Sequence, residues 1–416
     1  MSLRSTWPFR CWGCSVRLDQ RLRLLRTGAS PQPSASSQGD LAARLRRLGT
    51  ASRRQTPRKT PDEQALAAAL GAERLAPGVL RVRQRLDLGT RQGRVRLRDC
   101  LSALPGLLGE PAPHPSSWLF LDTETSGLAG GTGTWAFLCG LLRFAGDGLV
   151  STQYLLTRLD AERAYLEALG AELQAARLLV TYNGKSFDLP LLATRFRLAG
   201  CPSSFEDKHH LDLLHPMRRA FARMWPDCRL ATAEQRLLGF AREDDLSGAE
   251  APSAWLDWLR QGEIECLVAV LRHNLCDLLS LPALTRPLQQ TLIDPARVGA
   301  DIQRIAQLHL SRGDPDLALE LLSTNRDRLA PAALLDLARL HRQRGDWSAA
   351  SAIWEALAEQ KIPGALAAHA KYLEHRKRDY AKALAYVARL PPGLEREHRR
   401  ARLEKKLRGQ TPCPRS

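Results

Sequence analysis

One short segment constrains this chain more than any other: an apolar run that ends directly in two carboxylates. Residues 118–121 read Trp-Leu-Phe-Leu, the strongest strand signal in the sequence, and Asp122 and Glu124 follow at once. A single Asp there would indicate a cap or a turn. Side chains alternate along a strand, so these two carboxylates share one face, where their like charges repel each other. A hard cation such as Mg²⁺ or Mn²⁺ would relieve that repulsion, so the segment predicts a metal site.

The segments after this strand predict an α/β fold. Two further apolar runs, 135–144 and 149–157, have strand character. Amphipathic helices are expected at 161–176 and 188–199, with a buried strand at 178–182 between them. Consecutive strands followed by alternating helix and strand indicate a mixed sheet with flanking helices.

Two later motifs carry further candidate ligands. Asp188 closes the segment Asn-Gly-Lys-Ser-Phe-Asp at 183–188, between a predicted strand and a predicted helix, where a helix N-cap is the simpler interpretation. His273 and Asp277 are four residues apart within a helix expected at 264–281, so they share one helical face. Taken alone, that pair would be a solvent-facing ion pair.

The last quarter of the sequence contains a repeat. Residues 312–318 read Arg-Gly-Asp-Pro-Asp-Leu-Ala and recur in modified form at 344–350 and 377–383, at offsets of 32 and 33 residues. These offsets are close to the period of ~34 residues of tetratricopeptide helix pairs, in which a tight turn separates two helices and a small Ala lets them pack closely. We therefore expect an all-α, tetratricopeptide-like region, with an ordinary helical bundle as the alternative.

The formal charge of +17 is unevenly distributed along the chain. Residues 1–100 contain 21 Lys and Arg against 7 Asp and Glu, and residues 376–416 contain 13 against 4, which leaves a mildly acidic middle. Basic arms attract a polyanion such as nucleic acid, whereas an acidic middle fits chemistry that needs carboxylates. A solvated basic surface is the alternative, because Arg outnumbers Lys 52 to 9 and genome composition contributes to that excess.

The first sixty residues and the cysteines bear on the compartment in which the chain is expected. Residues 1–60 are rich in Arg, Ser and Pro, so we expect a basic leader with little fixed structure, although its composition also matches a transit peptide. No apolar stretch approaches ~18 residues, so no membrane-spanning segment is expected. The nine cysteines are scattered, and the one CxxC pair, Cys11 and Cys14, lacks the second pair of a zinc site; this predicts a reduced, cytoplasmic chain.

Two polar clusters are given no chemistry. His209, His210, Asp212 and His215 lack the spacing of a zinc site, and we interpret them as a loop or a helix face. Residues 244–245, Asp-Asp, are expected to form a turn with a helix cap.

The order of the carboxylate motifs resembles the DEDD exonuclease branch of the ribonuclease-H-like fold. That pattern has a strand ending in Asp-x-Glu, an Asn-to-Asp motif before a helix, and an Asp on a late helix. Residues 120–134, Phe-Leu-Asp-Thr-Glu-Thr-Ser-Gly-Leu-Ala-Gly-Gly-Thr-Gly-Thr, look like the YprB-type ribonuclease-H-like proteins, many of which also carry tetratricopeptide-like repeats. The resemblance covers roughly residues 100–285 and the helical repeats, and leaves out residues 1–60.

The resemblance implies a nuclease, specifically a metal-dependent 3′–5′ exonuclease acting on DNA or RNA with two Mg²⁺ or Mn²⁺ ions. Its metal ligands would be Asp122, Glu124, Asp188 and Asp277. His273 would be catalytic through the attacking water, although relatives place Tyr at this spacing or His five residues before the last Asp; hydrogen bonding to a carboxylate is the alternative role. Asn183 and Lys185 are expected only to support the ligands.

Several alternatives stay open at this point. One rival function is a non-catalytic nucleic-acid-binding scaffold whose helical repeats recruit a protein partner, and another is endonucleolytic cleavage. The presence of all four carboxylates favours the enzyme. The domains expected are a basic leader at 1–60, a small α/β lead-in at 61–110, the ribonuclease-H-like domain at 111–287 and the helical repeats with a basic tail at 300–410.

Overall fold

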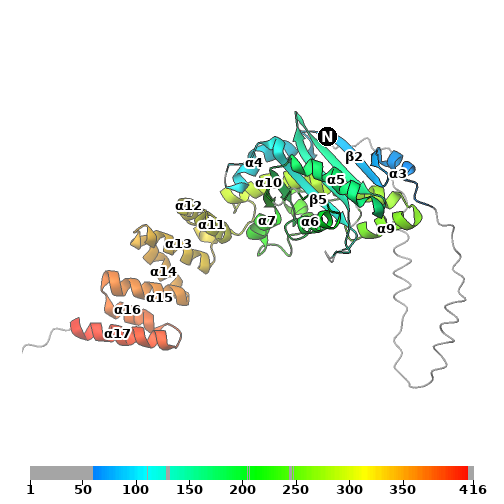
Figure 1. The fold of residues 1–416 in the computed structure, drawn as a ribbon. Helices are drawn as coiled ribbons and strands as arrows, with labels where there is room; N and C mark the ends of the chain where they lie inside the picture. Colours follow the sequence, from blue (N-terminus) through cyan, green and yellow to red (C-terminus); the bar gives the residue numbers. More distant parts are fainter. Residues whose placement is uncertain are drawn as a thin grey trace, which may run out of the picture.

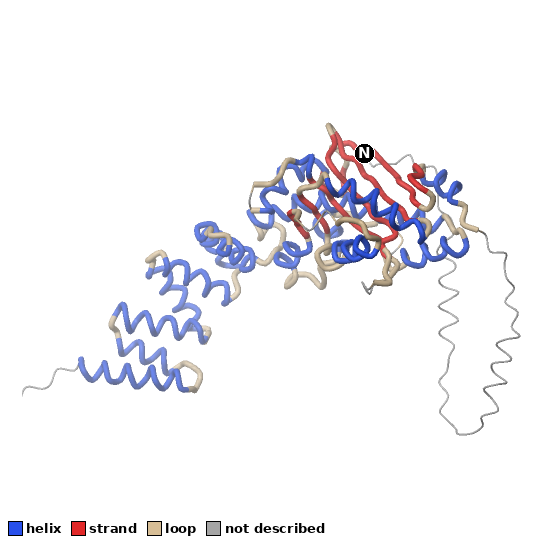
Figure 2. Tube along the Cα trace, viewed as in Figure 1, coloured by secondary structure: helices blue, strands red, loops and turns tan. Residues whose placement is uncertain are grey.

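The computed structural model contains a seven-stranded mixed sheet flanked by helices, from which a second, helical part extends (Figures 1 and 2). It describes residues 60–109, 111–127, 132–203, 205, 207–242, 246 and 248–410. The expected leader, except residue 60, and the expected Asp-Asp turn lie outside these residues. The α/β fold with a following all-α region, predicted from the sequence, is confirmed.

The sheet has the strand order β1-β2-β7-β6-β5-β8-β9. The strands are β1 (Glu73–Ala76), β2 (Val79–Asp87), β5 (Trp118–Thr125), β6 (Ala136–Ala145), β7 (Gly148–Leu156), β8 (Leu178–Thr181) and β9 (His209–Asp212), with β3 (Arg91–Gln92) and β4 (Val95–Arg96) as a separate hairpin. β5 is antiparallel to β6 and parallel to β8. The strand that ends in the two carboxylates therefore lies inside the sheet.

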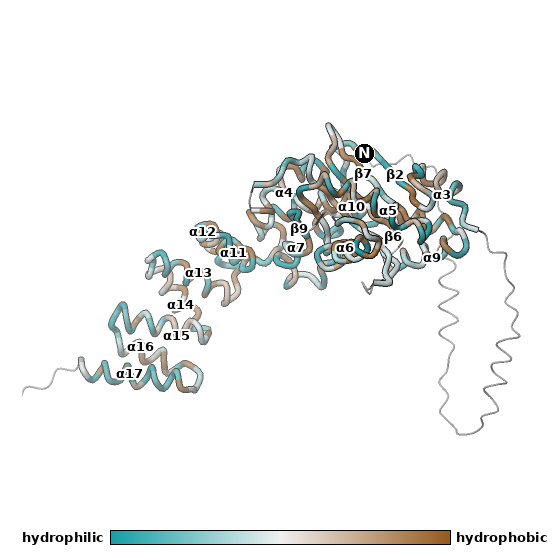
Figure 3. The backbone as a smooth tube through the Cα atoms, in the orientation of Figure 1, coloured by the Kyte–Doolittle hydropathy of each residue, from teal (hydrophilic) through white to brown (hydrophobic). Residues whose placement is uncertain are grey.

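Helices cover both faces of the sheet, and the alternation along β5 assigns its residues to them. Trp118 and Phe120 pack on the face that carries α4 (Cys100–Leu108), α7 (Leu214–Phe221) and α10 (Glu265–Ile293). Leu119 and Leu121 pack on the opposite face, which carries α5 (Glu162–Gln174) and α6 (Asp188–Leu198). The helices α3 (Glu63–Leu70) and α9 (Ala251–Gln261) belong to the same core cluster, and Leu70 of α3 lies near Gln153 and Leu271. The same alternation directs positions 122 and 124 toward α10. Hydrophobic segments gather inside this part of the molecule (Figure 3).

The expected lead-in at 61–110 shares the main sheet. β2 pairs with β7 along its whole length, from Val79 opposite Leu156 to Asp87 opposite Gly148. α3 begins at Glu63, because the side chain of Asp62 accepts from the N–H groups of Gln64 and Ala65. The alternating Arg and Val residues of this segment thus form the second strand of the sheet, and its buried residues Val79 and Leu80 belong to the core.

α10 is longer than the helix expected at 264–281. It continues through Pro282 and Pro287, and Leu284 and Leu288 beyond the first proline are fully buried. Burial of these residues against α4 outweighs the local cost of proline in a helix. Among the described residues, α10 is also the one helix long and apolar enough to cross a membrane by those two measures alone.

The chain after α10 forms a stack of antiparallel helices, here called the helical region. Its helices are α11 (Ile302–Ser311), α12 (Pro315–Thr324), α13 (Pro331–Gln343), α14 (Trp347–Glu359), α15 (Pro363–Tyr372), α16 (Tyr380–Ala388) and α17 (Leu394–Gln410). Each helix packs on the next one along the chain. The three sequence repeats lie at the turns after α11, α13 and α15.

The repeat positions have matching structural roles. Gly313 and Gly345 take left-handed conformations in the first two turns, with φ of 84° and 83°, and Arg378 takes φ of 56° in the third. The aligned residues Ala318 and Ala350 are fully buried, as is Ala383. A small side chain is thus present where neighbouring helices approach closely. The assignment of these pairs to the tetratricopeptide class stays a prediction.

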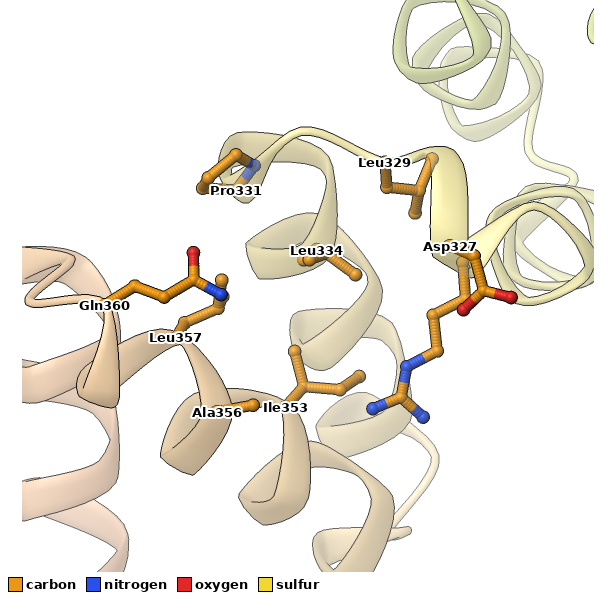
Figure 4. A pocket seen from close by; sticks show the side chains of 9 residues that line it. Asp327, Leu329, Pro331, Leu334, Ile353, Ala356, Leu357 and Gln360 are labelled. Atoms are coloured by element: carbon orange, nitrogen blue, oxygen red, sulfur yellow. The ribbon is translucent and has the colours of Figure 1, made fainter.

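The helical region is joined to the sheet domain by backbone and side-chain contacts. Arg312 donates to the carbonyl of Leu107 on α4 (2.9 Å), and the N–H of Asp301 donates to the carbonyl of Ala220 on α7 (2.8 Å). Within the helical region, a cavity of about 330 Å³ opens between the α12–α13 turn, α13 and α14 (Figure 4). Apolar side chains, among them Leu334 and Ile353, line it together with the polar side chains of Arg326, Asp327 and Gln360.

Candidate active site

The candidate site lies where β5 ends, between α10 and the start of α6. Asp122 and Glu124 come from β5, Asp188 is the first residue of α6, and Asp277 lies in the middle of α10. Glu124 and Asp188 are buried, with 7% and 8% of their surface exposed. The structure therefore brings together four carboxylates from three separate parts of the sequence.

Burial and mutual repulsion disfavour the charged forms of these groups. Burial raises the pKa of Asp122, and the nearby charges of Asp277, Asp188 and Glu124 raise it further. Burial also raises the pKa of Glu124 to about 8, although the nearby charge of His273 lowers it. For Asp188, burial raises the pKa to about 6 although Thr123 hydrogen-bonds it. Such a set of acids is relieved by a multivalent cation.

Asp188 reaches the site from the opposite face of the sheet through Thr123. The side chain of Thr123 points toward α6, between the two carboxylates of β5 that point toward α10. Its backbone N–H and its hydroxyl both donate to Asp188 Oδ1, at 3.1 and 2.5 Å. Thr123, which lies between the candidate ligands Asp122 and Glu124, thus fixes the candidate ligand Asp188. The side chain of Asp188 does not cap α6, because Phe187 occupies the N-cap position.

Asp212 holds the loop that precedes Asp188. This residue ends β9, is 3% exposed, and accepts from the backbone N–H groups of Asn183 (2.7 Å) and Lys185 (3.0 Å). Asn183 has a left-handed backbone with φ of 69°. The histidine-rich segment was interpreted as a loop or a helix face, and that interpretation is wrong for residues 209–212, which form a strand parallel to β8. Backbone pairing with β8 makes the segment a strand despite its polar composition, although only Asp212 of it is buried.

Asp277 is held by a buried ion-pair network that the sequence did not reveal. Arg242 forms a short ion pair with Asp277 and bonds both carboxylate oxygens of Glu234, at 2.9 and 2.7 Å. Glu234 is almost fully buried and also accepts from Ser280 on α10. Burial opposes the charge of Arg242, but its bonds to Glu234 and Asp277 raise the pKa of the guanidinium, so it stays cationic.

His273 faces the carboxylates with a defined tautomer. Its Nδ1 lies 3.2 Å from Arg242 Nη1, and a guanidinium can only donate, so Nδ1 is the acceptor. In the neutral imidazole the proton then resides on Nε2, which lies 3.6 Å from Asp277 Oδ2. A donor at Nε2 suits a hydrogen bond to a carboxylate, which is the alternative role given by the sequence.

Asn274, next to His273, is a further site residue that sequence reasoning missed. It is fully buried on α10, and its amide donates to Asp122 Oδ2 at 2.8 Å. A polar residue at an apolar-periodic helix position is the signal that would have identified it, because a buried amide needs a partner.

The residues present fit a divalent cation by the chemistry of their donor atoms. Among the described residues, one group of His, Cys, Asp and Glu offers ligand atoms within 4.8 Å of one another: Glu124, His273 and Asp277. Asp122 and Asp188 interact electrostatically with this group. Carboxylate oxygens are the preferred ligands of Mg²⁺ and Mn²⁺.

An open cavity lies beside the carboxylates. It has a volume of about 470 Å³, and Asp122 and Asp277 form part of its wall. Arg218 and Arg229 also line it, as does Tyr182. Positive side chains and carboxylates therefore share one opening.

The sequence of the chain matches a known superfamily and a bacterial relative. Residues 119–289 match the RNase_H superfamily. The uncharacterized protein YprB of Bacillus subtilis (strain 168) is 30% identical over 298 residues, which are 68% of this chain and 71% of that protein. Among solved structures, the family B DNA polymerase of the hyperthermophilic archaeon Pyrobaculum calidifontis is similar with a TM-score of 0.34 and 16% identity, over 56% of this chain and 30% of the polymerase. The chain therefore belongs to the YprB-type proteins of the ribonuclease H superfamily.

Proposed function

We propose that this protein is a metal-dependent nuclease that removes nucleotides from the 3′ end of a nucleic acid. The observation that carries the proposal is the convergence of Asp122, Glu124, Asp188 and Asp277, whose burial and repulsion fit divalent cations. Membership of the ribonuclease H superfamily supports nuclease chemistry.

The roles of the residues follow from their positions. The four carboxylates would hold two Mg²⁺ or Mn²⁺ ions, which supply an activated water and stabilise the leaving oxygen. Arg242 orients the carboxylate of Asp277, and Thr123 orients that of Asp188. His273 would donate from Nε2–H toward Asp277, whose Oδ2 lies 3.6 Å away. The exposed Arg218 and Arg229 would contact substrate phosphates in the adjacent cavity.

Basic surface outside the site supports nucleic acid as the partner. Arg376, Lys377 and Arg378 are exposed at the turn before α16, and Lys405 and Arg408 are exposed on α17. Lys406 on α17 bonds Glu374 in the same turn at 2.7 Å, so the two basic segments lie side by side. Such clusters neutralise phosphates without reading sequence.

A cleavage assay tests the proposal. The full chain is incubated with end-labelled single- and double-stranded DNA and RNA, with Mg²⁺, Mn²⁺ or EDTA. A ladder of products shortened from the 3′ end, abolished by EDTA, is the expected result. Internal cuts without a ladder would show an endonuclease instead, and intact substrates under all conditions would contradict nuclease activity.

A scaffold function is the second candidate, and the cavity of the helical region favours it (Figure 4). In that case the sheet domain binds nucleic acid without cleaving it, and the helical region recruits a protein partner. The two functions differ in one observable: a scaffold retards the labelled substrates in a gel and leaves their length unchanged.

A further inference from the structure

A chain of hydrogen bonds runs from a backbone carbonyl to Asp122. Gln153 Nε2 donates to the carbonyl of Leu271 (2.7 Å) and to Asn274 Oδ1 (2.8 Å), and Asn274 Nδ2 donates to Asp122 Oδ2 (2.8 Å). Gln153 is 5% exposed and Asn274 is fully buried. These two amides are here called the amide relay.

The carbonyl of Leu271 sets the direction of every later hydrogen bond in this series. The carbonyl of Leu271 can only accept, so Gln153 must present its NH₂ group there, and the same group reaches Asn274 Oδ1. With its oxygen so occupied, Asn274 must present its own NH₂ group to Asp122. A donor at this point matches an ionised carboxylate, which only accepts.

The sheet provides the space for this relay. Asp122, Gly140 and Gln153 lie opposite one another on β5, β6 and β7, so they form one row across three strands. The side chain of Asn274 occupies the middle of the row, because a Cβ at position 140 would lie 2.1 Å from Asn274 Oδ1. Any residue other than glycine at 140 would displace the amide. Gly140 within the buried strand β6 is therefore explained by the space that the Asn274 side chain needs.

We propose that Gln153 and Asn274 are positioning residues that fix the rotation of the Asp122 carboxylate for cation binding, with Gly140 providing their space. This inference rests on the proposed metal-dependent function. One oxygen of Asp122 is committed to Asn274, which prevents the carboxylate from turning about its Cβ–Cγ bond. A ligand held in one orientation loses less conformational freedom when a cation binds.

The test measures Mn²⁺ binding to the metal-free full chain by calorimetry, with no nucleic acid present. Gln153→Met removes the amide donor at similar length, and Asn274→Leu removes the last bond at similar size. Both are expected to weaken Mn²⁺ affinity about 10- to 100-fold. Gln289→Met is the control, because Gln289 lies on α10 like Asn274 but donates to the carbonyl of Ser102, away from Asp122. The Mn²⁺ affinity of this variant should equal that of the wild type.

The outcomes separate this inference from the function on which it rests. Wild-type Mn²⁺ affinity in folded Gln153→Met and Asn274→Leu would overturn the relay, while loss of binding in Asp122→Asn in the same series would uphold the metal site. A wild-type chain that binds no Mn²⁺ would overturn the proposed function itself. Melting temperatures identify any variant that does not fold, and if Gln153→Met is one, Asn274→Leu decides the question.

Discussion

Glu124 is a buried acid whose ionisation opposes folding when no cation is present. Its pKa is raised to about 8 by burial, whereas an unfolded Glu titrates near ~4.3. A raised folded-state pKa means that the unfolded chain releases this proton first, so stability falls as pH rises between these two values. The carboxylate that suits the cation therefore destabilises the metal-free fold.

Substitution of Glu124 should expose this cost. In EDTA at pH 8, Glu124→Gln is expected to raise the free energy of unfolding by about 1–3 kcal/mol, with a much smaller gain at pH 5, since one pKa unit corresponds to ~1.4 kcal/mol. Denaturant unfolding at the two pH values measures the change. Glu263→Gln, at an exposed position, is the control and should show no such gain. Equal stability of Glu124→Gln and wild type at pH 8 would contradict the account.

His273 is expected to orient a carboxylate. Because Arg242 donates to Nδ1, Nε2 already carries a proton and cannot accept one from water. A Gln side chain can still donate to Asp277, so His273→Gln should keep the cleavage rate within about tenfold of wild type. The fall of the rate at low pH, the acid limb of the pH–rate profile, should be the same in the variant and in the wild type. A loss of ~10²-fold or more together with loss of that limb would assign His273 to water activation.

At the scale of elements, helix packing in the repeats depends on small residues at fixed positions. Ala350 is fully buried on α14, two residues before the exposed Ala352. Protein interiors are close-packed, so added methylene groups force neighbours apart. The repeat in the sequence thus corresponds to a steric requirement between helices.

Overpacking at Ala350 tests that requirement. Ala350→Leu is expected to lower the free energy of unfolding by about 1–3 kcal/mol, whereas Ala352→Leu on the same helix should have little effect. Thermal or denaturant unfolding measures both variants. Equal stability of the two would mean that the buried repeat position is not tightly packed.

The elements of the site were predictable where one local pattern specified them. The apolar run before Asp122 predicted β5, and four-residue spacing predicted that His273 and Asp277 share a face of α10. Arg242, Gln153 and Asp212 were not predictable as site residues, because each acts through a long-range contact that only the sheet topology creates. The continuation of α10 through two prolines was missed because burial against α4 decides it.

At the scale of the whole molecule, an acidic middle lies between two basic arms. Residues 1–60 contain 13 Lys and Arg against 2 Asp and Glu. Carboxylates at the site repel a polyanion, so affinity for nucleic acid must come from positive charge elsewhere. We therefore expect the arms to set affinity and the carboxylates to set chemistry.

Deletion of residues 1–60 tests this division. The truncated chain should bind nucleic acid more weakly, and its affinity should depend less steeply on salt, because fewer counterions are released. Turnover at saturating substrate should persist. Fluorescence anisotropy over a range of salt concentrations gives the slope. An unchanged slope would show that the leader makes no phosphate contacts.

We propose that the four carboxylates form a cation site for phosphodiester cleavage. It is tested most directly by comparing Asp122→Asn and Asp277→Asn with Asp227→Asn, a variant of a carboxylate that lines the same cavity but bonds Thr232 and the N–H of Arg229. The measurement is the Mn²⁺-dependent cleavage rate of an end-labelled strand, with the melting temperature in EDTA recorded for each variant. We expect a loss of about 10³-fold or more in the first two variants, without loss of stability, and a near wild-type rate in the third. Full activity in Asp122→Asn or Asp277→Asn would contradict it.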